Sequence, residues 1–204
     1  TYHSIDANAY TDGACRQALR LLGEGLPRVQ DDPTDLEARL KCLMGAWMSM
    51  TGVITGSRLG ASHAIGHILG GSAGVPHGHT SCIMLPYVLN WNESVNGERQ
   101  KEVAIAMGRP GVAAGQVLDE FISGLDMPRR IRDAGVKESD LLRLAENCML
   151  DDWTYSNPRE IRSPEQVMEI FWMASTPTAK FTITVTATEI SRGWNTGSNR
   201  ASSF

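Results

Sequence analysis

The sequence predicts an all-α domain, because three observations agree. Apolar residues recur at every third or fourth position along most of the chain, which is the spacing of amphipathic helices. Proline and glycine stand where such segments would begin and end. The composition is that of an ordinary globular protein, with 42% hydrophobic and 21% charged residues. A chain of 204 residues is also long enough to bury a substantial core.

The first two helices are expected near the N-terminus. Thr11 with the aspartate after it is a plausible N-cap, and this helix should end near Gly25 to Pro27. A second helix should start at Pro33, since proline suits the first helical turn. From Leu43 to Ile54 the pattern becomes an almost continuous apolar run, which predicts a helix buried on most sides. Two glycines in this run would either admit a neighbouring helix or weaken the segment, and the sequence leaves both open.

A third helix should carry Leu59 to Leu69 and stop at the glycine pair Gly70-Gly71. The fourth should be kinked at Pro86 or begin there, and Ser163 should cap the last one. The fourth helix is expected at residues 82–91 and the last at residues 164–174. Between them, helices are expected at residues 98–107, 112–125 and 138–149.

The C-terminal end departs from the helical pattern. Between residues 178 and 188, threonines alternate with Phe181, Ile183, Val185 and an alanine, a period of two that is typical of a strand. We therefore expect a helical domain over residues 1–176 and a loose or edge-pairing tail over residues 177–204.

Charge and cysteine usage exclude several classes of protein. The formal net charge is −4 and lysine and arginine form no run, so neither nucleic acid nor an anionic membrane is an expected partner. No stretch approaches the ~20 apolar residues of a membrane helix, and the first residues are too polar for a signal peptide. The four cysteines stand singly, which predicts buried thiols in a reducing, cytoplasmic compartment rather than disulfides or a cysteine zinc site.

Four of the five histidines fall within seventeen residues, at His63, His67, His77 and His79. On a helix, His63 and His67 project from one face about one turn apart. Three glycines (Gly70, Gly71 and Gly74) and Pro76 then end the helix and turn the chain, which can bring His77 beside them. Imidazole suits Fe²⁺ or Zn²⁺, so a metal or catalytic site is favoured over a purely structural cluster.

A hydrolytic zinc site of the metalloprotease kind is excluded by one residue. That chemistry needs a glutamate directly after the first histidine as general base. Here the position is Ala64, and no carboxylate occurs anywhere between His63 and His77.

The residues around the histidines carry a resemblance to a known family. The block reads Gly60-x-x-His63-x-x-x-His67-x-x-Gly70, then Pro76-His77-Gly78, then Leu85-Pro86. It closely resembles the signature of the iron-containing alcohol dehydrogenases, including the maleylacetate reductases. Leu21-Leu22 with Leu26-Pro27, and Asn157-Pro158-Arg159, are supporting matches. The resemblance covers roughly residues 1 to 175 and implies the helical C-terminal domain of a dehydroquinate synthase-like fold.

The resemblance also implies roles for three histidines. The family binds its metal with an aspartate, a histidine four residues on, and two histidines of the signature, which are His63 and His77 here. His67 matches the histidine held to assist proton transfer near the nicotinamide. The aspartate and first histidine would precede Thr1, and His3 does not occupy that place. The implied cofactors are Fe²⁺ or Zn²⁺ and NAD(P), the latter bound mainly by a dinucleotide-binding domain ahead of this chain.

The expected function is therefore a metal-dependent, NAD(P)-linked oxidoreductase acting on a small alcohol, aldehyde or keto acid. Two alternatives stay open: a dehydroquinate synthase-like lyase domain, and a non-catalytic helical module that binds metal or a partner chain. The chain by itself is expected to be inactive. Its apolar helical surface would favour association, so a homodimer is among the expected states.

Three further residues are given lesser roles. For His79, a partly exposed position, a place behind the metal ligands and a substrate-facing position all stay open, and a position without a functional role is preferred. Asp151 and Asp152 form a carboxylate pair that could be catalytic, but a solvated helix end is the preferred interpretation.

Overall fold

The computed structural model describes residues 5–175, and these residues form helices and no strand, which confirms the all-α prediction. No helix in this range is long and apolar enough to cross a membrane. The helices are α1 (Ala9–Asp31), α2 (Leu36–Ser49), α3 (Thr51–Ile54), α4 (Ala61–Ala73), α5 (His77–Ala106), α6 (Ala114–Gly124), α7 (Leu141–Cys148) and α8 (Pro164–Ser175), with short 3₁₀ helices η1 (Ile131–Ala134), η2 (Glu138–Asp140) and η3 (Asp152–Ser156).

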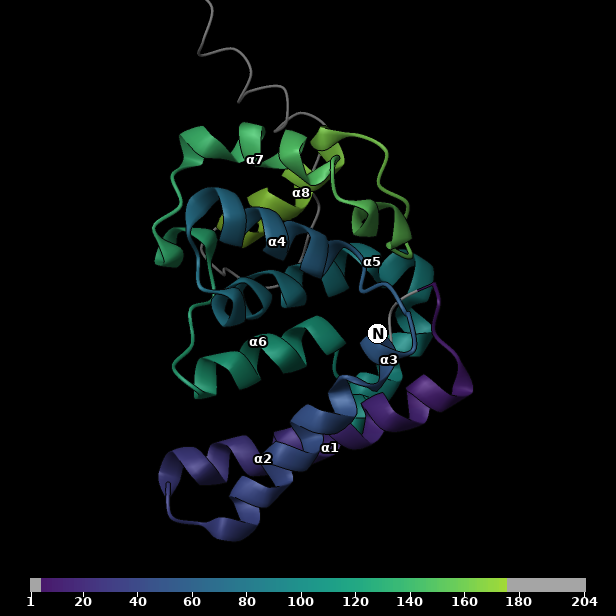
Figure 1. Cartoon of the computed structure of the whole chain (residues 1–204), viewed down its shortest axis with the longest axis vertical. Coiled ribbons are helices and arrows are strands. Elements are labelled where there is room, and N and C mark those ends of the chain that lie inside the picture. Colours follow the sequence, from purple (N-terminus) through teal and green to yellow (C-terminus); the bar gives the residue numbers. More distant parts are fainter. Residues whose placement is uncertain (1–4, 176–204) are drawn as a thin grey trace, which may run out of the picture.

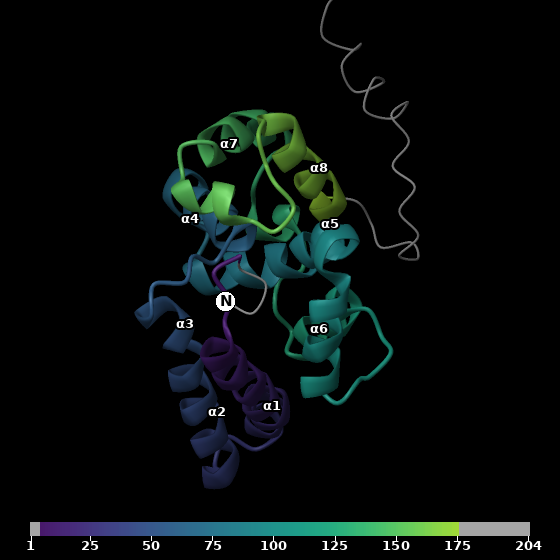
Figure 2. The same ribbon diagram turned by 90° about the vertical axis from the view of Figure 1, so that its right-hand side faces the viewer.

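The long helix α5 is the centre of the arrangement, because it packs against α1, α4, α6 and α8. In Figure 1, α4, α7 and α8 lie above α5, α6 lies below it, and α1 and α2 form an antiparallel pair at the bottom. The view turned by 90° keeps the α1–α2 pair at the opposite end from α7 and α8 (Figure 2).

Two apolar clusters hold these helices together. The larger cluster joins α4, α5, α7 and α8, and its fully buried side chains include Ile65, Ile83 and Phe171. The smaller cluster lies between α1, α5 and α6, around Leu89 and Val103. Helix α5 contributes to both clusters, and the larger cluster packs its N-terminal half against α4.

Helix α1 differs from the prediction at both ends. Its N-cap is Asn8, whose side chain accepts hydrogen bonds from backbone N–H groups of the first turn, so the helix starts earlier than Thr11 implied. The helix also runs through Pro27 to Asp31 instead of ending there. Gly25 serves packing rather than termination, since a Cβ at this position would lie 2.8 Å from the Sγ of Cys42 on α2.

The apolar run from Leu43 to Ile54 was expected to be a buried helix, and this prediction was wrong. Met50 divides the run into α2 and α3. Leu43, Trp47 and Ile54 are each about 70% exposed, since α2 packs mainly on α1. Gly45 faces α1 closely, because a Cβ there would lie 2.8 Å from Leu22.

The helix ends around the histidines are shifted from the predicted positions. Helix α4 continues through Gly70 and Gly71 and ends at Gly74, which adopts the left-handed conformation with φ of 69°. Helix α5 already begins at His77, passes Pro86 and kinks at Asn96, where φ is −136°. The two helices expected at 82–91 and 98–107 are therefore two halves of α5.

The predicted helices at 112–125, 138–149 and 164–174 correspond to α6, η2 with α7, and α8. The strand-like segment at 178–188 and the rest of the predicted tail lie outside the described residues.

Candidate functional site

Helix α4 starts from a tightly held backbone. Gly60, the residue before the helix, has φ of 73°, which favours glycine. The Oδ1 atom of Asn157 accepts a hydrogen bond from the backbone N–H of Ala61 at 3.3 Å. A Cβ on Gly60 would lie 3.3 Å from that same Oδ1 atom. The start of α4 is thus fixed against the loop that contains Asn157.

The turn after α4 brings two of the histidines together. Gly74 reverses the chain, the N–H of Val75 donates back to the carbonyl of Leu69 at 3.2 Å, and α5 starts at His77. As a result, the ring centroids of His63 and His77 lie 6.4 Å apart and the planes meet at 73°. Both rings belong to the first turns of their helices, so helix packing sets their separation.

A close approach of the two helices keeps this geometry. A Cβ on Gly66 of α4 would lie 2.9 Å from the Oγ1 atom of Thr80 on α5. Thr80 is fully buried, and its hydroxyl donates to the carbonyl of His77 at 2.7 Å. The backbone of His77 is therefore tied to the contact between α4 and α5.

His67 lies one turn along α4 from His63, and its contacts are different. Its Nδ1 atom is 2.7 Å from Oδ2 of Asp151, in the loop between α7 and η3. The ring of Trp153 lies against both histidines, with centroids 5.1 Å from His67 and 6.2 Å from His63. Asp151 does stand at a helix end, as the N-cap of η3, but the expectation of a solvated carboxylate is wrong, because the side chain is only 17% exposed and contacts an imidazole.

The surroundings of His63 keep its imidazole neutral. The pKa of His63 is lowered from 6.5 to about 4; burial is the largest cause, and the neighbouring imidazoles of His67 and His77 contribute to the same shift. Its Nδ1 atom is 3.2 Å from the hydroxyl of Ser62. A neutral imidazole has the free lone pair that a metal ligand needs.

The side chains of His79 and Asp152 do not contact the group formed by His63, His67, His77 and Asp151. His79 is half-buried in the first turn of α5, and no ring contact or hydrogen bond within residues 5–175 joins its side chain to the other three histidines. Asp152 is exposed, as the expectation of a solvated carboxylate requires.

A buried amide pair places the loop that carries Asp151 and Trp153. Asn157 and Asn92 exchange two hydrogen bonds, at 3.0 and 2.7 Å, and both are nearly inaccessible to solvent. Asn92 comes from α5 and Ala61 from α4, so Asn157 joins three segments. The Asn-Pro-Arg motif is visible in the sequence. The contact between Asp151 and His67 is not, because the two residues are 84 positions apart and no local residue spacing indicates it.

The donor set fits half of a metal site. The ring centroids of His63 and His77 are 6.4 Å apart, and imidazole nitrogen is a common ligand of zinc and iron. The described residues contain no group of three or more histidine, cysteine, aspartate or glutamate side chains arranged to hold a metal. The pair therefore needs further ligands to form a closed site.

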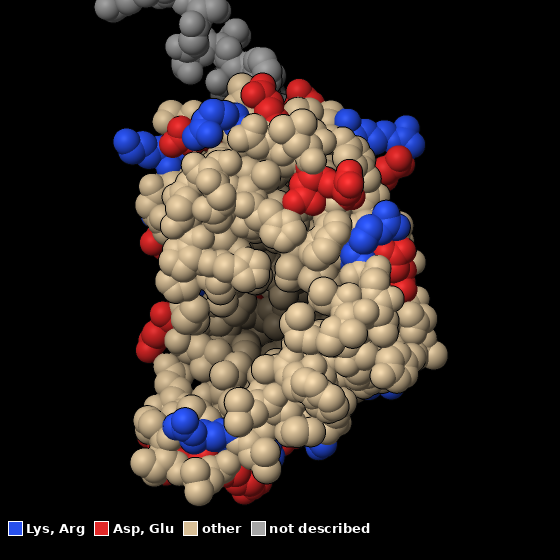
Figure 3. All heavy atoms as spheres, viewed as in Figure 1, with Lys and Arg blue, Asp and Glu red and all other residues tan. Residues whose placement is uncertain are grey.

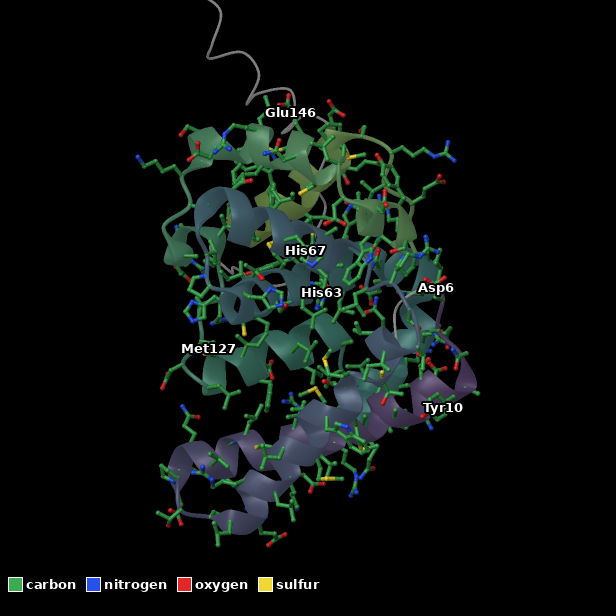
Figure 4. The ribbon with its side chains drawn as sticks, viewed as in Figure 1. Asp6, Tyr10, His63, His67, Met127 and Glu146 are labelled. Atoms are coloured by element: carbon green, nitrogen blue, oxygen red, sulfur yellow. The ribbon has the colours of Figure 1, made fainter. Side chains whose placement is uncertain are left out.

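Space-filling and stick views show what surrounds the histidines. Figure 3 shows a hollow in the middle of the molecule, between the layer with α4 and the α1–α2 pair, and in this view the charged side chains lie mainly toward the outer edges of the molecule. In the same view His63 and His67 lie in the middle of the molecule, on α4 (Figure 4).

Comparison with known proteins shows the family of this chain. The sequence model of the Fe-containing alcohol dehydrogenase family, C-terminal, matches residues 1–175. The chain is 31% identical over 182 residues to 1,3-propanediol dehydrogenase of Klebsiella pneumoniae, covering 85% of this chain and 46% of that protein. It is 29% identical over 161 residues to maleylacetate reductase 1 of Cupriavidus pinatubonensis, covering 79% and 44%. The chain thus spans about half the length of these curated relatives.

Solved structures show the same similarity. The structure of a 1,3-propanediol oxidoreductase matches with a TM-score of 0.78 and 31% identity, covering 85% of this chain and 47% of that one. A maleylacetate reductase from a Rhizobium species matches with a TM-score of 0.77 and 28% identity, covering 85% and 48%. The fold, the histidine block and the match over residues 1–175 agree, and the chain belongs to the iron-containing alcohol dehydrogenase family.

Proposed function

We propose that this chain is the helical half of a metal-dependent, NAD(P)-linked oxidoreductase that interconverts a small alcohol with its aldehyde or ketone. The observation that carries the proposal is the convergence of His63 and His77 from two helices, with His67 on the same face of α4. Family membership supports an oxidoreductase, and the relatives are named for 1,3-propanediol and for maleylacetate.

In this proposal His63 and His77 hold Fe²⁺ or Zn²⁺ together with ligands from outside the described residues. When bound, the ion would polarise the substrate oxygen, and NAD(P) would give or accept hydride. The low pKa of His63, about 4, keeps its imidazole available as a ligand throughout the physiological range.

His67 is the proposed proton-transfer residue. It is 40% exposed in its side chain, so a substrate can reach it, whereas His63 is more deeply buried. An imidazole can both accept and return a proton, which is why histidine is the most frequent general acid and base. Trp153 packs against the ring and limits the directions from which water can approach it.

The proposal assigns residues 1–176 to one helical unit and NAD(P) mainly to a dinucleotide-binding part of the full-length protein. Under this assignment the 204-residue chain alone turns over no substrate, because cofactor and helical unit must meet at the site. A small alcohol, aldehyde or keto acid is the proposed substrate class.

Metal content of the full-length protein tests the proposal. We expect His63→Ala and His77→Ala each to lose most of the bound iron or zinc and most NAD(P)-dependent turnover. His79→Ala is the matched control, because it removes an imidazole from the same segment without removing a proposed ligand. His67→Ala should keep its metal and lose turnover by about 10²- to 10⁴-fold, the usual contribution of a proton-transfer group.

Metal would be measured by elemental analysis after purification, and turnover by NADH oxidation with aldehydes and with maleylacetate. Circular dichroism would verify that each variant is folded. Unchanged metal and turnover in both His63→Ala and His77→Ala would refute the assignment.

A further inference from the structure

We propose that Asp151 is a positioning residue that holds His67 in the Nδ1–H tautomer, so that Nε2 is the nitrogen that exchanges a proton with substrate. The inference rests on the proposed role of His67 in proton transfer. It starts from the contact of 2.7 Å between His67 Nδ1 and Asp151 Oδ2, which joins two segments 84 residues apart in the chain.

The carboxylate of Asp151 is itself held in place. Its second oxygen, Oδ1, accepts a hydrogen bond from the backbone N–H of Trp153 at 2.9 Å, which caps η3. The backbone N–H of Asp151 donates to the carbonyl of Cys148 at the end of α7. The side chain of Asp151 is only 17% exposed. These contacts direct Oδ2 toward His67, whose own side chain is 40% exposed.

The chemistry of the two groups determines the tautomer. An ionised carboxylate can only accept hydrogen bonds, so the nitrogen that faces it must carry hydrogen. In the neutral imidazole, hydrogen on Nδ1 leaves the lone pair on Nε2. Among residues 5–175, no hydrogen bond engages Nε2 of His67, which leaves that atom available to a ligand. An imidazole that donates its other N–H to a carboxylate is oriented and made more basic.

The ring plane is restrained as well. The indole of Trp153 lies against His67 with ring centroids 5.1 Å apart and planes inclined at 48°. Because Trp153 follows Asp151 closely in the chain, one short segment supplies both the acceptor for Nδ1 and the wall beside the ring. Rotation of the imidazole would break both contacts.

The proton balance of the proposed reaction follows from this arrangement. In alcohol oxidation, a bound nicotinamide would supply the acceptor for the hydride, and Nε2 of His67 would take the O–H proton. The resulting imidazolium would keep its Nδ1–H on Asp151, so the new positive charge would form beside a carboxylate. In the reverse direction the cofactor would supply the hydride, and Nε2 would return the proton to the oxygen.

Asp151→Asn tests the inference in the full-length protein. Asparagine can still accept from the N–H of Trp153, but it can present its amide N–H to Nδ1 and favour hydrogen on Nε2. We expect kcat to fall about 10- to 100-fold with KM changed less than about threefold, in line with the loss of a carboxylate behind a histidine. Asp151→Glu should restore part of the rate. Asp152→Asn is the matched control, with the same charge change on an exposed neighbour, and should leave kcat unchanged.

A spectroscopic readout is independent of activity. In the zinc-loaded full-length protein labelled with ¹⁵N-histidine, the signals of His67 are identified by their absence in His67→Gln. We expect Nδ1 to show the shift of a hydrogen-bearing nitrogen and Nε2 that of a lone-pair nitrogen. Asp151→Asn should exchange or mix the two, and Asp152→Asn should not.

The outcomes separate this inference from the proposed function. Hydrogen on Nε2 of the neutral ring in the unchanged protein, or wild-type kcat in a folded Asp151→Asn, overturns the role of Asp151. If Asp151→Asn fails to fold, the spectrum of the unchanged protein and the rate of Asp151→Glu decide. A protein without NAD(P)-dependent turnover contradicts the proposed function, while the tautomer in the spectrum still tests the contact.

Discussion

His63 and His67 occupy the same face of one helix, yet their surroundings give them different chemistry. His63 is recessed against His77 and Trp153, and burial lowers its pKa to about 4. His67 is more exposed and lies on a carboxylate, which stabilises a hydrogen on its ring. These surroundings suit the two proposed roles, in which His63 donates a lone pair to a metal and His67 carries a proton, although only four residues separate them.

The recessed imidazole makes the metal-free protein sensitive to acid. The pKa of His63 is about 4 when folded and near 6.5 when unfolded, so both states are neutral above pH 6.5. As the pH falls from 6.5 toward 4, the unfolded chain binds a proton that the folded chain does not, and stability is lost. One pKa unit corresponds to about 1.4 kcal/mol, so the free energy of unfolding should fall by up to about 3 kcal/mol over this pH interval.

Urea unfolding with a chelator at pH 7.5, 6 and 5 measures this loss. His63→Gln should be less sensitive over the same interval, whereas His79→Gln, with a half-buried imidazole from the same segment, should follow the unchanged protein. Equal pH dependence in His63→Gln and the unchanged protein would contradict the burial argument.

At the residue scale, the sequence predicted the histidines but not their partners. The spacing of His63 and His67 and the glycine turn before His77 are local features, so the pattern could indicate a shared site. The contact of Asp151 with His67 depends on how η3 folds back on α4 through the buried Asn157–Asn92 pair. Such a contact between distant segments has no counterpart in periodicity or spacing.

At the scale of the helices, type and order were predictable and glycine roles were not. A glycine near the end of an apolar pattern predicts the end of a helix, and helix ends were expected near Gly25 and at Gly70. In the structure Gly25 admits Cys42 of a neighbouring helix, and Gly70 lies inside α4. The actual end is at Gly74, where the left-handed backbone is required. Whether a glycine ends a helix or allows a close contact is decided by the partner helix.

The contact between α4 and α5 gives a paired test of this point. Gly66→Ala would place a Cβ 2.9 Å from the Oγ1 of Thr80 and disturb the hydrogen bond from that hydroxyl to the carbonyl of His77. We expect a loss of about 1 to 2 kcal/mol, as for other overpacked core sites. Gly71→Ala, in the same helix with no atom within 4 Å of the new Cβ, should be neutral or stabilising by up to about 1 kcal/mol.

Thermal and urea unfolding would compare the two variants, and elemental analysis would follow the metal in the full-length protein. Gly66→Ala should also bind metal more weakly, because His77 moves with α5. A Gly66→Ala protein as stable as Gly71→Ala would show that the helices have room to separate.

On the scale of the whole molecule, α2 differs from the other long helices because it contributes to neither apolar cluster. Helix α2 buries only Ala38 and Gly45, while Leu43 and Trp47 point away from both apolar clusters and are about 70% exposed. The prediction of a buried helix failed here because periodicity reports how apolar a face is, not what covers it. By contrast, α5 is buried along most of its length and belongs to both clusters.

This difference predicts unequal local stability in the 204-residue chain. Amide hydrogens exchange through openings whose free energy is lowest where few apolar contacts must be broken. Opening α2 exposes little that is not already exposed, whereas opening α5 separates both clusters. We expect amides of α2 to exchange at least about tenfold faster than those of α5 between residues 80 and 92, an opening free energy lower by about 1.4 kcal/mol or more.

Hydrogen exchange followed by mass spectrometry resolves the two segments. Leu89→Ala serves as the control, since a cavity between α1, α5 and α6 should speed exchange in α5 toward the rate of α2. Equal protection of α2 and α5 would mean that the exposed face of α2 is covered in solution, for instance by a second copy, and dilution would then distinguish self-association from intrinsic stability.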